Sequence, residues 1–197
     1  CLKIQYPGVA DAIDSDMRAL VRLLKLSRLV PMTEQFNMWL DEVREMLKRE
    51  VDYDLEAHTT RHFRAALADD TRLVVPEIVP EFSTHNIMCM TFERGIGVND
   101  PAVLELSQTR RNFIGRAIME LCCREVFEWN KMQTDPNFGN YLLRIGETPE
   151  QDQIVLLDFG AIRDFDNDVL GPGREMIRAS FYHDTDRLIR ALNALDF

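Results

Sequence analysis

The sequence predicts an α+β fold with two lobes, a small mixed lobe followed by a mainly helical one. Short apolar runs bounded by Pro and Gly, typical of strands, lie mainly in the first half and in one later hairpin. Apolar residues at three and four spacing, typical of helices, make up most of the rest. We therefore predict a partial N-lobe with long inserted helices over residues 1–92 and a helical C-lobe over residues 93–197. A hinge is expected near residues 90–97.

The composition is that of a folded globular chain that does not bind nucleic acid. Hydrophobic residues make up 46% and charged residues 28% of the 197 positions, which allows a sizeable core. The net charge of −10 argues against a broad phosphate-binding surface, because such a surface needs clustered Lys and Arg. A nucleotide held through Mg²⁺ is compatible with this charge. No apolar run approaches the ~20 residues of a membrane helix.

The first elements of the N-lobe follow from local patterns. Residues 2–5 alternate apolar and polar, the period of a half-buried strand, and the Pro-Gly pair after them ends the strand. A helix is predicted from residue 10 to about 29, where Pro31 stops the pattern. Thr33 is the predicted N-cap of a second, long helix that reaches about Leu67.

The elements after residue 70 are more varied. We expect two strands with a Pro-bounded connection, an apolar strand leading into a Gly-containing loop, one long helix, two strands of a hairpin and a last helix interrupted near His183. In chain order these elements are predicted over residues 72–82, 87–92, 101–129, 141–144, 154–157 and 173–195.

The four cysteines lack the spacing of a metal site. Cys122 and Cys123 are adjacent within an apolar helical pattern, and Cys1 and Cys89 are isolated. Free buried thiols in a reducing compartment are a better interpretation than disulfides. The start at Cys1, inside an apolar run, suggests an excised fragment, so a targeting segment would lie outside this sequence.

Three acids on the predicted long helix are not expected to form one metal cluster. Glu50 shares the apolar stripe that contains Trp39 and Met46, while Asp52 and Glu56 point to another side of the helix. A carboxylate on an apolar stripe needs a partner, because unpaired burial of charge is costly.

A constellation of motifs suggests a nucleotide site. Asp135 precedes Asn140 by five residues, and Asp158 opens an Asp-Phe-Gly triplet. Lys3 lies on a strand and Glu56 on a helix. Phosphoryl transfer from ATP needs an Asp near the attacking oxygen, an Asn and an Asp on Mg²⁺, and a Lys on the phosphates held by a Glu. Each motif alone has a plainer explanation, namely a turn, an edge charge or a solvated helix face. Their order and spacing together favour a shared site.

Three further patterns do not favour functional sites. His58 and His62 lie one helical turn apart but lack a third metal ligand. Cys122-Cys123 lacks the C-x-x-C spacing of a redox pair. Residues 164–168 lack the Gly and the distal Glu of a calcium loop, so a solvated cap before the last helix is preferred.

Four segments resemble motifs of the UbiB/AarF family of atypical kinase-like ATPases. The family's invariant-Lys strand is similar to LKIQYPGV, its E-x-D motif and helix Glu to EVDYDLEA, its catalytic loop to QTDPNFGN, and its metal loop to LLDFGAIRDF. The resemblance runs in register from Leu2 to about Phe165 and implies a protein-kinase-like two-lobed fold. Gln-Thr-Asp in the catalytic loop is closer to the mitochondrial and proteobacterial branch than to the His-x-Asp of many family members. The family's K-x-G-Q motif and alanine-rich phosphate loop are absent, which implies an N-lobe that is incomplete at its N-terminus.

The resemblance implies a role for each residue of the expected site. Lys3 contacts the α- and β-phosphates and pairs with Glu56. Asp135 is the catalytic-loop Asp. Asn140 and Asp158 are Mg²⁺ ligands, and Asp158 is the principal one.

The same resemblance implies roles for four more residues. Glu50 and Asp52 form the E-x-D pair, which in the family meets an N-terminal extension folded over the site. This supplies a hypothesis for the charge of Glu50 on the apolar stripe. Met90 and Glu93, at the predicted hinge, are expected among the nucleotide-binding residues.

In function, the resemblance implies a Mg-ATP-binding protein, with ATP and Mg²⁺ as cofactors, that hydrolyses ATP in support of ubiquinone biosynthesis. Two alternatives stay open, a phosphotransferase acting on a protein or small molecule, and a nucleotide-gated lipid-binding scaffold with negligible turnover. Implied partners are quinone precursors or prenyl lipids and other quinone-biosynthesis proteins. The implied location is peripheral, at the mitochondrial inner membrane or the bacterial cytoplasmic membrane. The fragment alone is expected to be inactive, because part of its nucleotide roof is absent.

Overall fold

The computed structural model describes residues 1–27, 30–31, 33–135 and 137–195. The chain forms two compact units that alternate along the sequence. The first unit contains residues 1–104 and 137–161, and the second contains residues 105–136 and 162–197. The lobe boundary expected after residue 92 stays a prediction.

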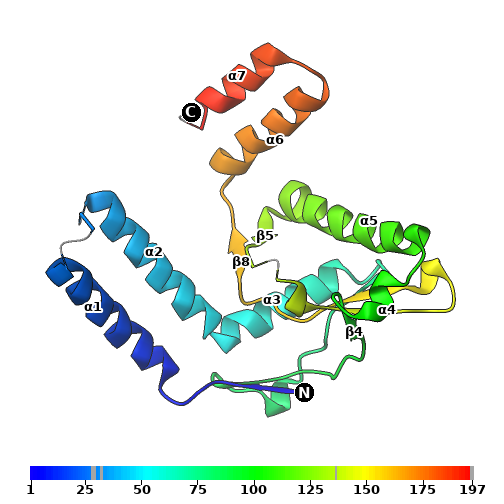
Figure 1. Cartoon of the computed structure of the whole chain (residues 1–197), viewed down its shortest axis with the longest axis horizontal. Coiled ribbons are helices and arrows are strands. Elements are labelled where there is room, and N and C mark those ends of the chain that lie inside the picture. Colours follow the sequence, from blue (N-terminus) through cyan, green and yellow to red (C-terminus); the bar gives the residue numbers. More distant parts are fainter. Residues whose placement is uncertain (28–29, 32, 136, 196–197) are drawn as a thin grey trace. The chain divides into compact units, whose positions relative to one another are not determined.

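The first unit begins with one strand and three helices, which are β1 (Leu2–Ile4), α1 (Val9–Ser27), α2 (Glu34–Glu50) and α3 (Tyr53–Ala66). α1 and α2 form a helical hairpin (Figure 1), and Asp14 of α1 pairs with Arg44 and Lys48 of α2. The predicted N-cap of the second helix is confirmed, because the Thr33 hydroxyl accepts a hydrogen bond from the Phe36 N–H.

The single helix expected over residues 33–67 is wrong, because the chain breaks between α2 and α3. Val51 ends α2, and Asp52 is the N-cap of α3. The Asp52 side chain accepts a hydrogen bond from the Leu55 N–H at 2.9 Å. A short acidic side chain that bonds a nearby N–H starts a new helix rather than continuing the old one. The apolar spacing ran through the break and concealed it.

The strands of the first unit form two sheets. β1 pairs antiparallel with β3 (Ile87–Cys89), which places Lys3 opposite Met88. The second sheet has four strands in the order β2 (Leu73–Val74), β7 (Gln153–Leu156), β6 (Tyr141–Arg144) and β4 (Ile96–Gly97). The antiparallel β6–β7 hairpin confirms the predicted strand pair. Its side chains Leu143, Ile154 and Val155 are buried in the core of the unit.

Two predicted strands are shorter than expected. The segment over residues 72–82 gives only β2, and its second half forms a 3₁₀ turn, Pro80–Phe82. Proline lacks the N–H that a strand ladder needs, which limits extended pairing there. The strand expected over residues 87–92 ends at Cys89, and Met90 forms an isolated bridge with Ile78.

The second unit is mainly helical and contains one two-stranded sheet. Its elements are α5 (Gln108–Arg124), a π-turn (Glu125–Trp129), β5 (Lys131–Gln133), β8 (Ile162–Asp164), α6 (Asn167–Phe181) and α7 (Thr185–Asn193). β5 and β8 pair antiparallel, with Met132 opposite Arg163. This pair was not predicted, because three-residue strands carry too little periodicity to be recognised in the sequence.

The helix expected over residues 101–129 is divided into three. α4 (Pro101–Leu104) belongs to the first unit, and Ser107 starts α5 by accepting a hydrogen bond from the Arg110 N–H. After α5 the π-turn follows, and Asn130 ends it with a left-handed φ of 54°. Ser107 is an N-cap signal that the apolar spacing on both sides masked.

The last two helices confirm one expectation and correct another. α6 begins at Asn167 instead of Gly173. Pro172 removes one N–H from the helix but does not end it, so the helix continues on both sides of the proline. The interruption near His183 is confirmed, since His183 has a left-handed φ of 55°. Asp184 then caps α7 by accepting a hydrogen bond from the Arg187 N–H at 2.9 Å.

The thiols are free, as predicted, but their expected burial is wrong. Cys1, Cys122 and Cys123 are exposed, and Cys89 is half-buried. The adjacent cysteines lie on the outer side of α5, where the apolar pattern continues beyond its buried face. Among the described helices, none is both long enough and apolar enough to cross a membrane.

Candidate functional site

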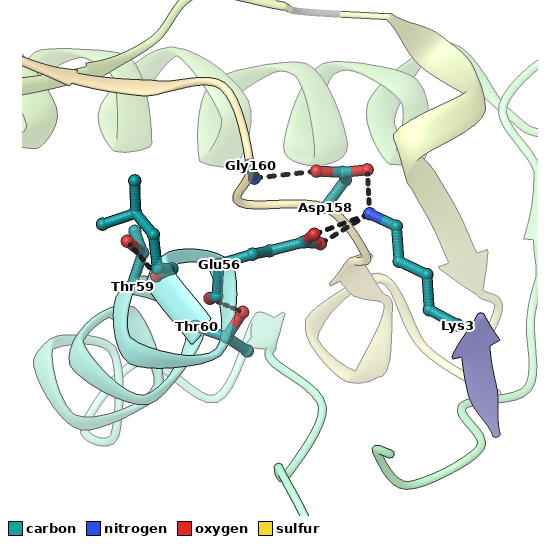
Figure 2. A network of polar contacts seen from close by, with 7 residues as sticks. Lys3, Glu56, Thr59, Thr60, Asp158 and Gly160 are labelled. Carbon is teal, nitrogen blue, oxygen red and sulfur yellow. Dashed lines mark hydrogen bonds and ion pairs between the residues drawn. The ribbon is translucent and has the colours of Figure 1, made fainter. Parts of the chain in front are cut away.

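Three side chains that are far apart in the sequence meet in the first unit (Figure 2). The Lys3 ammonium donates to both carboxylate oxygens of Glu56 at 2.8 Å and to Asp158 Oδ2 at 3.1 Å. Glu56 is 1% exposed, whereas the side chains of Lys3 and Asp158 are 33% and 34% exposed. The cluster therefore joins a buried acid to a cation and a second acid that solvent can reach.

β1 directs Lys3 toward α3. Lys3 and Gln5 are half-buried, while the apolar residues between and beside them are exposed, which reverses the usual alternation. The Lys3 Nζ also lies 5.3 Å from the centre of the Tyr53 ring, close enough for a cation–π interaction. Sequence analysis missed Tyr53, although its place one turn before Glu56 on the same helix is a usable signal.

The charges in the cluster shift one another's pKa. Burial alone lowers the pKa of Lys3, but the carboxylates of Glu56 and Asp158 outweigh burial and raise it. Burial raises the pKa of Glu56, the Lys3 ammonium offsets this only in part, and Asp158 adds to the rise. Lys3 is thus held as an ammonium between two acids, one of which is costly to ionise.

α3 fixes Glu56 and the Asp-Phe-Gly triplet to each other. The Thr60 hydroxyl donates to the Glu56 carbonyl at 2.7 Å inside the helix (Figure 2). Phe63 is fully buried, and its ring centre lies 5.1 Å from that of Phe159, the middle residue of the triplet. This aromatic contact positions Asp158, because Asp158 immediately precedes Phe159 in the chain.

The backbone at Gly160 lies so close to the Asp158 carboxylate that a side chain would crowd it. Its N–H donates to Asp158 Oδ1 at 2.8 Å. A Cβ at this position would lie 3.2 Å from that oxygen and 3.6 Å from Glu56 Oε2. The tight approach to the Asp158 carboxylate, rather than an unusual φ, favours a glycine here.

The β6–β7 hairpin brings Asn140 next to the triplet. Tyr141 pairs with Leu156, and the Asn140 carbonyl accepts a hydrogen bond from the Leu157 N–H at 2.9 Å. Asn140 therefore lies beside the residue that precedes Asp158. The Mg²⁺ role of Asn140 and Asp158 stays a prediction.

Asp135 belongs to the second unit, in the loop after β5. Its N–H donates to Gln133 Oε1 at 3.3 Å. The strand before this loop is held by β8 and by Glu125, whose carboxylate accepts a hydrogen bond from the Gln133 N–H at 3.4 Å. The catalytic role of Asp135 stays a prediction.

Glu125 was not singled out by the sequence analysis. It is 5% exposed and opens the π-turn. Burial raises its pKa, and the Gln133 N–H offsets this only in part. Glu125 continues the buried four-residue spacing of Ala117 and Leu121, so an acid on an apolar stripe was the signal available.

The E-x-D residues are at the surface. Glu50 is exposed, and Asp52 is exposed as the cap of α3. Glu50 lies on the predicted stripe, but Trp39 and Met46 on that stripe are themselves 54% and 49% exposed. The role of the pair stays a prediction.

The two residues expected at the hinge are engaged within the first unit. Met90 is buried in a core cluster with Tyr53. Glu93 forms an ion pair with Arg144 and accepts a hydrogen bond from the Thr91 hydroxyl at 2.7 Å. Burial raises the pKa of Glu93, but these two partners outweigh it and lower the pKa. The nucleotide contacts predicted for Met90 and Glu93 stay predictions.

The donor set suits Mg²⁺ better than a transition metal. Within the described residues no three His, Cys, Asp or Glu side chains lie close enough to hold a metal by themselves. The predicted ligands Asp158 and Asn140 both carry side-chain oxygen atoms. Mg²⁺ prefers such oxygens and takes its remaining ligands from water and phosphate.

Comparison with known sequences assigns the family. The ABC1 atypical kinase-like domain matches residues 1–192. The chain belongs to this family. The predicted resemblance to UbiB/AarF atypical kinases is therefore confirmed.

Two mitochondrial relatives of this family illustrate the match. A Saccharomyces cerevisiae protein named atypical kinase COQ8 is 41% identical over 176 residues, covering 89% of the chain and 34% of that protein. The Rattus norvegicus atypical kinase COQ8B is 37% identical over 196 residues, covering 100% of the chain and 36% of that protein. The chain thus spans about a third of the length of these relatives.

A solved structure supports the fold class. Rv3197 of Mycobacterium tuberculosis, determined as a complex with erythromycin, matches with a TM-score of 0.71 and 26% identity. The match covers 97% of the chain and 47% of that protein. The predicted α+β, kinase-like fold is confirmed.

Proposed function

We propose that this chain is the Mg-ATP-binding part of an atypical kinase-like ATPase that supports ubiquinone biosynthesis. The observation that carries the proposal is the cluster of Lys3 with Glu56 and Asp158. A lysine that is kept protonated beside an accessible acid suits a ligand that brings both phosphates and a metal ion. Membership of the ABC1 family supports ATP as that ligand.

Each residue of the cluster has a distinct task. Lys3 supplies positive charge to the phosphates, and Glu56 holds its ammonium in place. Asp158 and Asn140 hold Mg²⁺, which neutralises phosphate charge when it is bound. Asp158 Oδ2 accepts from Lys3 in this structure, so a cation at Asp158 competes with Lys3 and frees it for the phosphates.

The remaining predicted residues complete the proposal. Asp135 orients water or another acceptor. Met90 and Glu93 border the nucleotide. The exposed pair Glu50 and Asp52 meets a further segment of the protein.

The proposed setting follows from the relatives. Those compared above carry mitochondrial names, which supports a mitochondrial location. Peripheral attachment to a membrane, and partners among quinone precursors, prenyl lipids and other quinone-biosynthesis proteins, are part of the same proposal.

The test traces the γ-phosphate of labelled ATP with the full-length protein and Mg²⁺. We expect label to appear as free phosphate, whereas a labelled protein or small molecule would instead support a phosphotransferase. Asp158→Asn should abolish turnover, because it removes the charge that holds Mg²⁺. Asp69→Asn, at an exposed position of the same unit, is the matched control.

A genetic test separates an ATPase from a scaffold. In a strain that lacks quinone for want of this protein, Asp158→Asn should fail to restore quinone while Asp69→Asn restores it. Full rescue by Asp158→Asn would show that turnover is not the function and would favour the nucleotide-gated scaffold.

A further inference from the structure

The corner between α2 and α3 leaves one backbone carbonyl without a helical donor. In a continuous helix the Val51 carbonyl would accept from the N–H of Leu55, four residues on. Here the Leu55 N–H is taken by the Asp52 side chain at 2.9 Å. Carbonyls at the end of a helix need another donor when they are not open to water.

Gln5, the residue directly after β1, supplies that donor. Its Nε2 lies 2.6 Å from the Val51 carbonyl, across 46 residues of sequence. A carbonyl only accepts hydrogen bonds, so the amide nitrogen of Gln5 must face it. The Gln5 backbone is fixed as well, because its N–H donates to the Asn86 carbonyl at 2.9 Å.

Gln5 and Lys3 form a two-point link between β1 and the corner. Gln5 is the residue directly after β1, and it is half-buried like Lys3 while Ile4 between them is exposed, so the two side chains point the same way. Lys3 binds Glu56 in the first turn of α3, and Gln5 binds the residue just before the cap of α3. Two bonds fix the helix start against rotation about either one, which a single ion pair does not do.

We propose that Gln5 is a positioning residue that sets the start of α3, and through it the Lys3–Glu56 pair. Val51 is the middle residue of the Glu50–Asp52 pair, so the same bond couples that surface pair to the buried acid of the site. The consequence for turnover rests on the proposed ATPase function. The positional effect on Lys3 does not, and it is measured separately.

The experiment uses the full-length protein with Gln5→Met, which keeps the side-chain length but loses the donor, and Gln5→Glu, which replaces the donor with an acceptor. Gln35→Glu, at an exposed position of α2, controls for the added charge. Without nucleotide, modification of the Lys3 amine by an amine-reactive ester is followed by peptide mass spectrometry, together with amide hydrogen exchange over residues 53–60. Lys25, exposed on α1, is the internal reference.

We expect both Gln5 variants to raise Lys3 modification and exchange in α3 by about 2- to 12-fold, the range of one hydrogen bond, with Lys25 and Gln35→Glu unchanged. Unchanged Lys3 modification would overturn the proposal. Equal increases throughout the first unit would also overturn it, because they would indicate general destabilisation rather than positioning.

Turnover is measured on the same samples. A fall in kcat by a similar factor supports the link to the reaction, and an unchanged kcat with a raised Lys3 reactivity would overturn that link. If the unaltered protein shows no ATP turnover or binding, the proposed function fails, while the Lys3 and exchange measurements still decide the positional role of Gln5.

Discussion

The two units each bury a glutamate, and they do so in different ways. Glu56 in the first unit is met by the Lys3 ammonium at 2.8 Å. Glu125 in the second unit accepts one backbone N–H at 3.4 Å, and no cation of the described residues lies against it. Burial raises the pKa of both acids. Glu56 is therefore one member of an ion-pair cluster. Glu125 instead holds the backbone of the strand that leads to the Asp135 loop.

The difference shows that burial alone does not say whether an acid belongs to the candidate site. A buried carboxylate with a cation beside it contributes when both partners are present and costs most when one is removed. A buried carboxylate without a cation costs free energy whenever it ionises. The two glutamates should thus respond in opposite directions to loss of charge.

The largest effect should come from making Glu56 resemble Glu125. Lys3→Met leaves a buried carboxylate without its cation and should lower the free energy of unfolding by about 2–3 kcal/mol, somewhat below the range for a fully buried pair because Lys3 is a third exposed. Chemical denaturation at pH 7 measures this. Lys25→Met is the exposed control, and the double variant with Glu56→Gln should recover part of the loss. Additive losses in the double variant would contradict the pairing.

The next largest effect on stability should come from the Tyr53 ring. Tyr53→Phe keeps a π-face 5.3 Å from the Lys3 ammonium, whereas Tyr53→Met removes it. We expect the Met variant to be about 1 kcal/mol less stable than the Phe variant, from lost cation–π and packing terms. Thermal unfolding measures the difference. In the Lys3→Met background the difference should shrink, and if it does not, the ring acts only through packing.

A third prediction concerns the Glu93–Arg144 ion pair, in which an acid outside the cluster also has a cation beside it. The pKa of Glu93 is lowered in the folded protein by Thr91 and Arg144 acting against burial. Its contribution is therefore present above the ordinary value of 4.5 and is lost as the pH falls through the lowered pKa. Glu93→Gln should cost about 0.5–1 kcal/mol at pH 7 and nothing once wild-type Glu93 is protonated. Denaturation curves at several pH values test this, and a constant cost at all pH values would argue against the ion pair.

The smallest effect on stability should be an increase, and it should come from removing the charge of Glu125. The raised pKa of Glu125 means that its favourable contribution is present below the ordinary value of 4.5 and is lost as the pH rises through the folded-state pKa. Glu125→Gln should therefore be about 0.5 kcal/mol more stable than wild type at pH 7, an advantage that shrinks toward pH 5. Glu105→Gln, at an exposed position of the same unit, is the control. A destabilised Glu125→Gln at pH 7 would show that an unrecognised cation compensates the charge.

Local signals predicted much of the fold, and they failed where two signals overlapped. The Thr33 cap, the β6–β7 hairpin and the break at His183 were all readable, because each depends on residues close in sequence. Asp52 and Ser107 carried equally good cap signals. Apolar spacing continued across both, so two separate helices were predicted as one.

The sequence predicted the charged residues of the candidate site better than the residues that hold them in place. Lys3, Glu56 and Asp158 were named from motif type and order, and the structure places them in one network. Gln5 and Tyr53 were not, although both lie within the quoted motifs LKIQYPGV and EVDYDLEA, because their contacts join residues that are far apart in the sequence. Glu50 was placed on the apolar stripe and is exposed, since a helical stripe gives the side that a residue faces but not what covers it.

By itself, the sequence determined the types of side chain available for phosphate chemistry, their order and their local geometry, because caps, turns and strand alternation act over a few residues. Only the tertiary structure decided that Lys3 meets Glu56 and Asp158, which are 53 and 155 residues away. The β1–β3 pairing, the corner at Val51 and the β6–β7 hairpin bring these residues together in space. Such long-range pairings are set by packing and burial of the whole unit, which no local window of residues contains.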